Sequence, residues 1–187
     1  MREQRHGLAR LARGRRVLNG FAYTGTLSVL AARGGAAEVT SVDLSAGVLA
    51  WGRDNFRASG LDPADPRWRF ESDDVGRFLE RAAADGRRFD LLLLDPPTFS
   101  LARGAGFALE RDYPALVARA CAVVPPGGLL WLASNTRAVP LLDLVRQGLA
   151  QARREAALLS QAGLPPDHPT LPSQPEDRYL QALLLRI

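Results

Sequence analysis

Short apolar runs alternate with amphipathic stretches along most of this chain. The apolar runs predict strands at residues 16–21, 38–44, 68–72, 89–94, 128–133, 158–160 and 179–187. The stretches with apolar residues at helical spacing predict helices at residues 27–33, 45–60, 75–84, 113–124 and 141–156. Residues 100–107 and 162–177 carry neither pattern, so we expect loops there.

The alternation of strands and helices is typical of a doubly wound α/β sheet, in which right-handed crossovers place helices on both faces. The leucine-rich run at 89–94 is typical of strands that parallel sheets bury on both sides. We therefore expect a mostly parallel, Rossmann-like sheet with one antiparallel strand near the C-terminus. Ligands of such sheets bind beyond the carboxyl ends of the strands, so the residues that follow each strand are the candidate site.

Size and composition favour one globular domain over residues 1–187, because 47% of the residues are hydrophobic and suffice for a core. No apolar run reaches the roughly 18 residues that a membrane span needs. The basic N-terminus lacks the apolar centre of a secretory signal. We therefore expect a cytoplasmic protein without membrane contact.

The net charge is +4, and arginine supplies all 24 of the Lys and Arg positions. Guanidinium groups suit phosphates and base edges, so the charge is compatible with a nucleic-acid partner. A GC-rich gene would give the same arginine bias, so the charge alone does not demonstrate that partner. Cys121 is the only cysteine, which excludes an intramolecular disulfide and a cysteine-based zinc site.

The turn after the first predicted strand, at residues 19–26, is not the G-x-G-x-x-G that a pyrophosphate requires. A nicotinamide dehydrogenase is therefore disfavoured. Gly25 would let the chain turn tightly into the next helix, and small neighbours would leave room for a ligand. An ordinary strand–helix turn explains the same residues equally well.

Acidic residues follow the second and third predicted strands. Asp43 is placed to accept hydrogen bonds from ribose hydroxyls; its alternative role is a helix N-cap, which Ser45 can also fill. Asp74 is placed to accept from the exocyclic amine of adenine, with Val75 packed on the ring. Capping of the following helix explains Asp74 equally well.

The most specific signal is D-P-P-T-F-S at residues 95–100, after the fourth predicted strand. Two prolines form a rigid corner without backbone N–H groups, and their carbonyls can accept from a base amine. Phe99 offers a face on which an extruded base can stack. The polar residues 134–137 after the fifth strand either touch the substrate or form a simple polar turn.

In these segments the chain resembles the bacterial 23S rRNA methyltransferases of the cytosine-5 and guanine-N7 group, which use S-adenosylmethionine (SAM). V-L-N-G-F-A-Y-T-G at residues 17–25 is similar to their V-L-N-L-F-x-Y-T-G. E-Q-R at residues 3–5 resembles their D-Q-R element, and D-H-P at residues 167–169 resembles a D-H-P of the cytosine-5 branch. The resemblance implies a class I methyltransferase fold, SAM as cofactor and RNA, foremost ribosomal RNA, as partner.

The resemblance also implies roles for individual residues. The cofactor would be bound by Arg5, Phe21, Tyr23, Thr24, Gly25, Asp43, Leu44, Asp74, Val75 and Asp95. The reacting base would be held by a catalytic set of Asp95, Pro96, Pro97 and Phe99. We expect no metal.

Cysteine usage bears on the reaction. Methylation of cytosine at C5 needs a thiolate that adds to the ring, and the cytosine-5 branch carries it after the fifth strand, where this chain has residues 134–136 without a cysteine. Cys121 lies at an apolar helical position and is expected in the core. We therefore expect direct transfer to a ring or amino nitrogen. The resemblance favours guanine N7, because the guanine-N7 branch shares D-P-P-T-F-S and an S-N-like turn after the fifth strand.

Several alternatives stay open: a cytosine-5 rRNA enzyme, a methyltransferase for DNA or another substrate, and a non-catalytic module that binds SAM or RNA. The family usually carries an N-terminal RNA-binding module. Only about a dozen residues precede the first predicted strand, so we expect that module to be absent here and its role to fall to an upstream domain or a partner protein.

Overall fold

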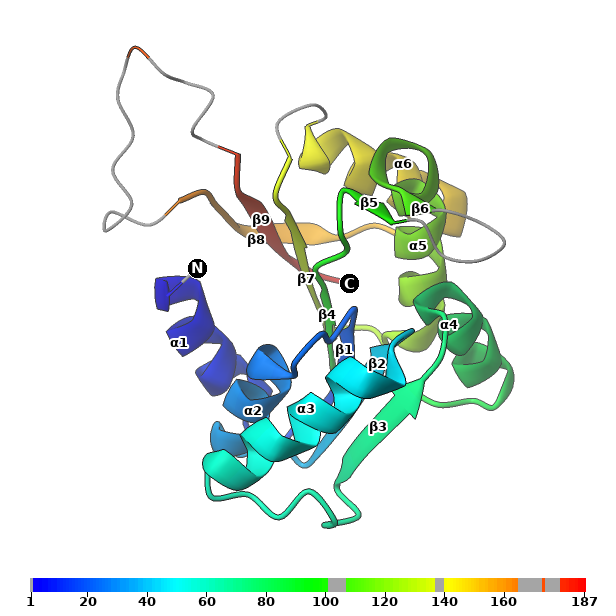
Figure 1. The fold of residues 1–187 in the computed structure, drawn as a ribbon. Helices are drawn as coiled ribbons and strands as arrows, with labels where there is room; N and C mark the ends of the chain where they lie inside the picture. The colour runs from blue at the N-terminus through cyan, green and yellow to red at the C-terminus, as the bar shows by residue number, and fades with distance from the viewer. Residues whose placement is uncertain (1, 101–106, 137–139, 165–172, 174–178) are drawn as a thin grey trace.

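Seven strands form one sheet in the computed structural model, which describes residues 2–100, 107–136, 140–164, 173 and 179–187. In chain order they are β1 (Arg16–Gly20), β2 (Glu38–Asp43), β3 (Trp68–Ser72), β4 (Leu91–Leu94), β7 (Leu129–Ser134), β8 (Ala157–Ala162) and β9 (Gln181–Arg186). The sheet order is β3-β2-β1-β4-β7-β9-β8 (Figure 1). The strands from β3 to β7 pair in parallel, and β9 is antiparallel to both of its neighbours. The prediction of one antiparallel strand near the C-terminus is confirmed.

Helices cover both faces of the sheet (Figure 1). One face carries α1 (Arg2–Ala12), α2 (Thr26–Arg33) and α3 (Ala46–Ala58). The other carries α4 (Val75–Ala84), α5 (Leu109–Val123) and α6 (Leu141–Ala152). This is the doubly wound arrangement that the alternation of elements predicts.

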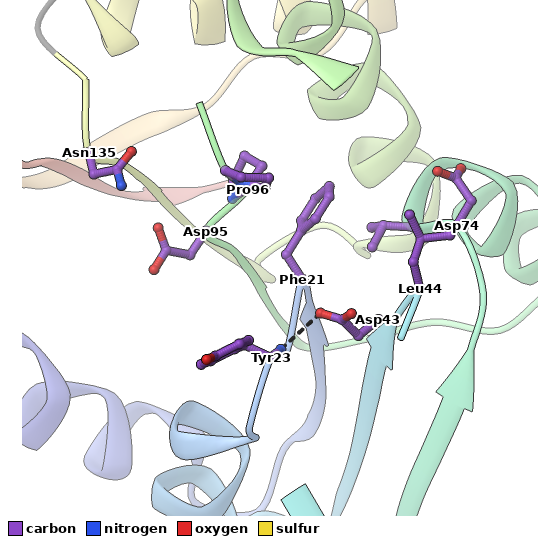
Figure 2. Close-up of a pocket in the computed structure, with 10 residues that line it drawn as sticks. Phe21, Tyr23, Asp43, Leu44, Asp74, Asp95, Pro96 and Asn135 are labelled. Atoms are coloured by element: carbon purple, nitrogen blue, oxygen red, sulfur yellow. Dashed lines mark hydrogen bonds between the residues drawn. The ribbon is translucent and has the colours of Figure 1, made fainter. Parts of the chain in front are cut away.

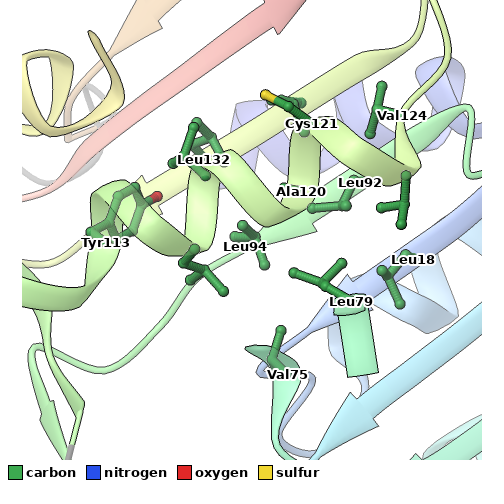
Figure 3. Close-up of a cluster of buried hydrophobic side chains, with 14 of the residues drawn as sticks. Leu18, Val75, Leu79, Leu92, Leu94, Tyr113, Ala120, Cys121, Val124 and Leu132 are labelled. Atoms are coloured by element: carbon green, nitrogen blue, oxygen red, sulfur yellow. The ribbon is translucent and has the colours of Figure 1, made fainter. Parts of the chain in front are cut away.

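The central strand β4 belongs to both layers of the core because successive side chains of a strand point to opposite faces. Leu91 and Leu93 join the apolar cluster under α1–α3. Leu92 and Leu94 join the cluster under α4–α6, part of which Figure 3 shows. All four leucines are 0% exposed, and each such burial contributes roughly 1.5–3 kcal/mol.

Side-chain caps set the starts of two helices as predicted. The Ser45 hydroxyl accepts from the Val48 amide at 3.4 Å, so α3 begins at Ala46. The Asp74 carboxylate accepts from the Arg77 amide at 2.9 Å, so α4 begins at Val75. These caps satisfy amide groups that the helices themselves leave without partners.

Helix α1 lies where no element is predicted from the sequence. Its segment is rich in arginine, and of the helix residues with described side chains, 7–12, two are buried in the core, Leu8 and Ala12. The helix lies so close to α2 that a Cβ added at Gly34 would be 2.1 Å from the carbonyl oxygen of Ala9. The position of α1 therefore depends on its packing against α2 rather than on an apolar pattern of its own.

The other departures concern the ends of elements. The expected loop at 100–107 is bordered by two short paired strands, β5 (Phe99–Ser100) and β6 (Phe107–Ala108). Helix α5 begins four residues before the predicted start, with Asp112 accepting from the Ala108 amide at 2.8 Å. Helix α6 ends at Ala152, four residues before the predicted end, because Arg153 adopts a left-handed backbone conformation with φ 51°.

Candidate active site

A cavity of about 360 Å³ opens at the carboxyl edge of the parallel strands (Figure 2). Its size falls within the range of small-molecule sites. Its lining comes from the segments after β1, β2, β4 and β7 and from the start of α4, and consists of Phe21, Tyr23, Asp43, Leu44, Asp74, Val75, Asp95, Pro96, Pro97 and Asn135. The structure thus brings most of the predicted site residues together. It adds Asn135, for which the sequence allowed two roles, a substrate contact or part of a simple polar turn.

The turn after β1 holds two residues in strained conformations. Phe21 and Tyr23 have φ values of 58° and 48°, a left-handed region that few non-glycine residues occupy. Surrounding hydrogen bonds fix the turn: the Tyr23 amide donates to Asp43 at 3.0 Å, and Asn55 donates to the carbonyl of Thr24 at 2.8 Å. The strain is therefore built into the wall of the cavity.

Thr24 and Gly25 do not line the cavity. Gly25 has φ 72° and begins α2, where a Cβ would approach the backbone of Gly52 to 3.5 Å. Together with the bond from Asn55 to Thr24, this close packing makes both residues part of the frame of the turn. Their predicted contact with the cofactor stays a prediction.

Asp43 joins the ends of β1 and β2. Its Oδ2 accepts from the Tyr23 amide and its Oδ1 from the Ser45 amide, both at 3.0 Å. Ser45, not Asp43, is the N-cap of α3. Each carboxylate oxygen has a further lone pair, and the carboxylate lies in the cavity lining (Figure 2).

The two neighbouring aspartates after β3 have different surroundings. Asp74 lines the cavity and also caps α4, so the two roles that the sequence left open coexist geometrically. Asp73 pairs with Arg81 and, at 3.8 Å, with Arg77. Asp74 therefore lines the cavity, and Asp73 does not.

Asp95, Pro96 and Pro97 follow β4 and line the cavity. Figure 2 shows Asp95 and Pro96 at the end opposite Asp43 and Asp74. Pro96 is buried, whereas Pro97 is exposed. Tyr113 of α5 is fully buried nearby and donates to the carbonyl of Ala133 at 3.4 Å. Burial, with the added charge of Asp95, raises the pKa of the Tyr113 phenol, which therefore stays neutral.

A polar contact links the segments after β4 and β7. The Thr98 hydroxyl donates to Oδ1 of Asn135 at 2.7 Å. The backbone beside Asn135 is held from β9, because the side chain of Gln181 donates to the carbonyl of Thr136 at 2.8 Å and accepts from the Leu141 amide at 2.9 Å. Only the position of this turn at a strand end pointed to it in the sequence.

A buried polar cluster that no sequence motif indicates lies beneath the β1 turn. The side-chain amide of Asn19 donates to Ser28 at 2.9 Å, and the hydroxyl of Ser41 donates to Ser28 at 2.8 Å. All three side chains are at most 2% exposed. The cluster ties β1, α2 and β2 together, so the asparagine of the V-L-N segment supports the turn from below.

Cys121 lies within the apolar cluster of α5 and is 3% exposed (Figure 3). It is absent from the cavity lining. Burial raises the pKa of its thiol, which opposes formation of a thiolate. The expectation that Cys121 is a core residue is confirmed.

Some predicted site residues have no described side chain. Arg5 lies in α1 and Phe99 in β5, but only their backbones are described. Residues 137 and 167–169 lie outside the described ranges. Among the described residues, no group of three or more His, Cys, Asp and Glu side chains is placed to hold a metal ion, and no helix has the length and apolarity to span a membrane.

The side chains that line the cavity suit a nucleoside ligand. Asp43 and Asp74 offer acceptors for hydroxyl and amine groups, while Phe21, Leu44 and Val75 supply apolar surface for a ring. A sheet of this order with such a cavity at its carboxyl edge defines a class I methyltransferase domain. The chain belongs to the S-adenosylmethionine-dependent methyltransferase family, whose model matches residues 1–186, and SAM is the cofactor of that family.

Two relatives illustrate the similarity. Ribosomal RNA large subunit methyltransferase K/L of Chromohalobacter salexigens is 46% identical over 138 residues, which are 73% of this chain and 18% of that protein. Ribosomal RNA large subunit methyltransferase I of Erwinia tasmaniensis is 35% identical over 190 residues, which are 100% of this chain and 47% of that protein. The chain thus spans less than half the length of these relatives.

Solved structures agree with the family. A methyltransferase in complex with S-adenosylhomocysteine (SAH) superposes with a TM-score of 0.89 at 26% identity, over 100% of this chain and 49% of that one. A SAM-dependent methyltransferase from Streptococcus mutans gives a TM-score of 0.87 at 28% identity, over 100% and 48% of the two chains.

Proposed function

We propose that this chain transfers the methyl group of SAM to a nitrogen of an RNA base, with N7 of a guanine in ribosomal RNA as the target. The observation that carries the proposal is one cavity with Asp43 and Asp74 at one end and Asp95, Pro96 and Pro97 at the other. The only cysteine is buried elsewhere, which argues against a covalent cytosine-5 reaction. The names of the rRNA methyltransferases among its relatives support RNA as the substrate.

At the cofactor end, Asp43 accepts from the ribose hydroxyls and Asp74 from the adenine amine. Phe21, Leu44 and Val75 pack against the adenine ring. The exposed ring of Tyr23 borders the cavity, and the frame formed by Thr24 and Gly25 brings the backbone close to the ligand. The assignment of Arg5 to the cofactor rests on the resemblance of its segment alone.

At the substrate end, Asp95 and the Pro96 carbonyl orient the base, and Phe99 stacks on it. Prolines at 96 and 97 remove backbone N–H groups, so this corner offers acceptors only. SAM supplies a methyl group already activated by its sulfonium. Since guanine N7 carries no proton, the side chains have to align the base and exclude water rather than abstract a proton.

RNA recognition would be shared with an upstream domain or a partner protein, because the chain matches less than half of its rRNA methyltransferase relatives. Ribosomal RNA as the substrate would place the reaction in the cytoplasm.

Two linked measurements test the proposal. Calorimetric titration with SAH should give micromolar binding. Tritium transfer from labelled SAM to under-modified ribosomal RNA, followed by mass-spectrometric location of the methyl group, should then give 7-methylguanine. A methyl group on cytosine C5 or on DNA would replace the proposal by one of its alternatives, and a folded chain that binds no SAH would point to a non-catalytic module.

A further inference from the structure

Asn135 occupies the substrate end of the cavity. It follows β7, which lies beside β4, with Leu132 in register with Leu94. Asp95 and Pro96 therefore approach the same end from the neighbouring strand (Figure 2). The carboxylates of Asp43 and Asp74 come from the other half of the sheet, so Asn135 faces the proposed base rather than the nucleoside part of the cofactor.

The amide of Asn135 is held in one orientation. Its Oδ1 accepts from the Thr98 hydroxyl at 2.7 Å, which leaves Nδ2 with two N–H donors for the cavity. Thr98 is itself anchored, because its carbonyl accepts from the Leu109 amide at 3.2 Å. The backbone after Asn135 is fixed by the bond from Gln181 to Thr136.

Asn135 also supplies a side-chain hydrogen-bond donor at the substrate end of the cavity. Asp95 is an acceptor when ionised, and Pro96 and Pro97 have no N–H group. Among the described residues of the lining, the other uncharged side chain with a donor is Tyr23, which comes from the β1 turn. The substrate end thus combines several acceptors with one oriented donor.

This pattern distinguishes the two purines. Beside N7, guanine carries the acceptor O6, whereas adenine carries the N6 amine, a donor. Asparagine commonly reads adenine with both amide atoms, but here Oδ1 is already engaged by Thr98. A free Nδ2 donor at this edge matches O6 of guanine and opposes the amine of adenine.

We propose that Asn135 selects guanine over adenine by donating from Nδ2 to O6 of the base, and that Thr98 is the positioning residue that holds its amide. This inference rests on the proposed function, because it assumes a purine with N7 as the reacting atom. It names Asn135 as the residue that recognises the base and O6 as the atom that is recognised.

The test uses purine analogues in short single-stranded RNAs that contain one purine each, with tritiated SAM and the full chain. Inosine keeps O6 and N7, whereas 2-aminopurine keeps N7 but lacks O6. Wild-type kcat/KM should be similar for guanine and inosine and about 10- to 100-fold lower for 2-aminopurine and adenine. In Asn135→Ala, guanine should fall to the level of 2-aminopurine, while SAH affinity stays within about twofold of wild type.

Two further variants separate readout from a structural role. Asn135→Asp replaces the donor by an acceptor and should prefer adenine to guanine. Thr98→Val should lower the ratio of kcat/KM for guanine to that for adenine. Thr98→Ser, which keeps the hydroxyl, should retain the wild-type ratio. An unchanged guanine preference in Asn135→Ala overturns the inference, and so does a loss of SAH binding, because Asn135 would then serve the cofactor.

The proposed function fails in a different way. If wild type labels pyrimidine-only RNA and no purine, the reaction itself is wrong, whereas guanine labelling with an unaltered preference in Asn135→Ala refutes Asn135 alone. If turnover is too slow to measure, the side-chain amide signals of Asn135 in an NMR spectrum, assigned by their loss in Asn135→Ala, report the contact directly. With SAH bound, they should shift on addition of guanosine monophosphate and not of adenosine monophosphate; equal responses to the two nucleotides overturn the inference.

Discussion

The carboxylate of Asp43 joins three parts of the molecule, because it receives backbone amides from the β1 turn and from the entry to α3 while lying in the cavity lining. A charged acceptor makes stronger hydrogen bonds than a neutral one. This single side chain therefore both shapes the strained turn and presents an anionic surface to the ligand.

Replacing Asp43 by Asn should lower SAH affinity by about tenfold or more, because a hydrogen bond to a charged group contributes roughly 1.5–3 kcal/mol. Calorimetric titration measures the change. Asp54→Asn is the matched control, since Asp54 lies on the exposed side of α3 in a pair with Arg57 and should leave affinity unchanged. Equal affinities for wild type and a folded Asp43→Asn would refute the ribose assignment.

Replacing Cys121 by Ala should leave methyl transfer within about twofold of wild type, because no step of the proposed reaction uses a thiol. The buried site would lose one sulfur atom from the core around α5, so a modest fall in the thermal midpoint is expected. Tritium transfer and a melting curve measure the two effects. Complete loss of activity in a folded protein would restore the thiolate mechanism.

At the scale of elements, local chemistry decided what the sequence could predict. Helices α3 and α4 begin where Ser45 and Asp74 cap them, and such caps are visible in the sequence. Helix α1 has no such signal, because its place depends on contact with α2. The contact between Thr98 and Asn135 joins residues 37 positions apart, so only the folded sheet reveals which amide atom is engaged.

Gly34→Ala should loosen α1 from α2, since the new Cβ would lie 2.1 Å from the Ala9 carbonyl oxygen. Overpacking of this kind costs about 1–3 kcal/mol. The change is measured by urea unfolding together with hydrogen exchange of the α1 amides. Gly47→Ala in α3 is the control: its nearest neighbour would be 3.8 Å away, and the better helix former should not destabilise the chain. Equal losses in the two variants would contradict the close contact.

An ion pair at the amino ends of β1 and β4, away from the cavity, should make the stability of the protein depend on pH. Arg16 binds Asp90 with two guanidinium nitrogens and its amide, and this side chain lowers the pKa of Asp90. A lowered folded-state pKa stabilises the protein above the unfolded value of about 3.9 and ceases to do so as the pH falls through the folded value.

Asp90→Asn should therefore be less stable than wild type by about 1 kcal/mol at pH 7, the upper end for a partly exposed pair. The difference should narrow as the pH falls below about 4. Urea midpoints at several pH values measure it, with Asp54→Asn as an exposed-pair control. A gap that stays constant down to acidic pH would assign the effect to packing instead.

At the scale of the whole molecule, β4 contributes buried side chains to both apolar layers of the core. The sequence predicted this layering because the leucine run has no polar face, and it predicted the edge at which ligands bind. It did not reveal the buried cluster of Asn19, Ser28 and Ser41, since small polar residues look alike whether they are buried or exposed. Such clusters become visible only once the topology brings three elements together.

Leu93→Ala should lower the free energy of unfolding by about 2–5 kcal/mol, because the site is fully enclosed between the sheet and its helices. Leu159→Ala on β8 removes the same atoms from a side chain that is 43% exposed and should cost far less. Urea unfolding compares them. Similar losses would mean that Leu93 is not enclosed in the apolar layer under α1–α3.

The place of β9 between β7 and β8 has a consequence for protein synthesis. A ribosome makes β9 after every residue that lines the cavity, yet Gln181 of this strand holds the turn that carries Asn135. A nascent chain with β1 to β8 already outside the ribosome therefore has the whole lining and Thr98, but it lacks the bond from Gln181 that holds the backbone of this turn. The turn after β7 would therefore be fixed later than the rest of the cavity lining.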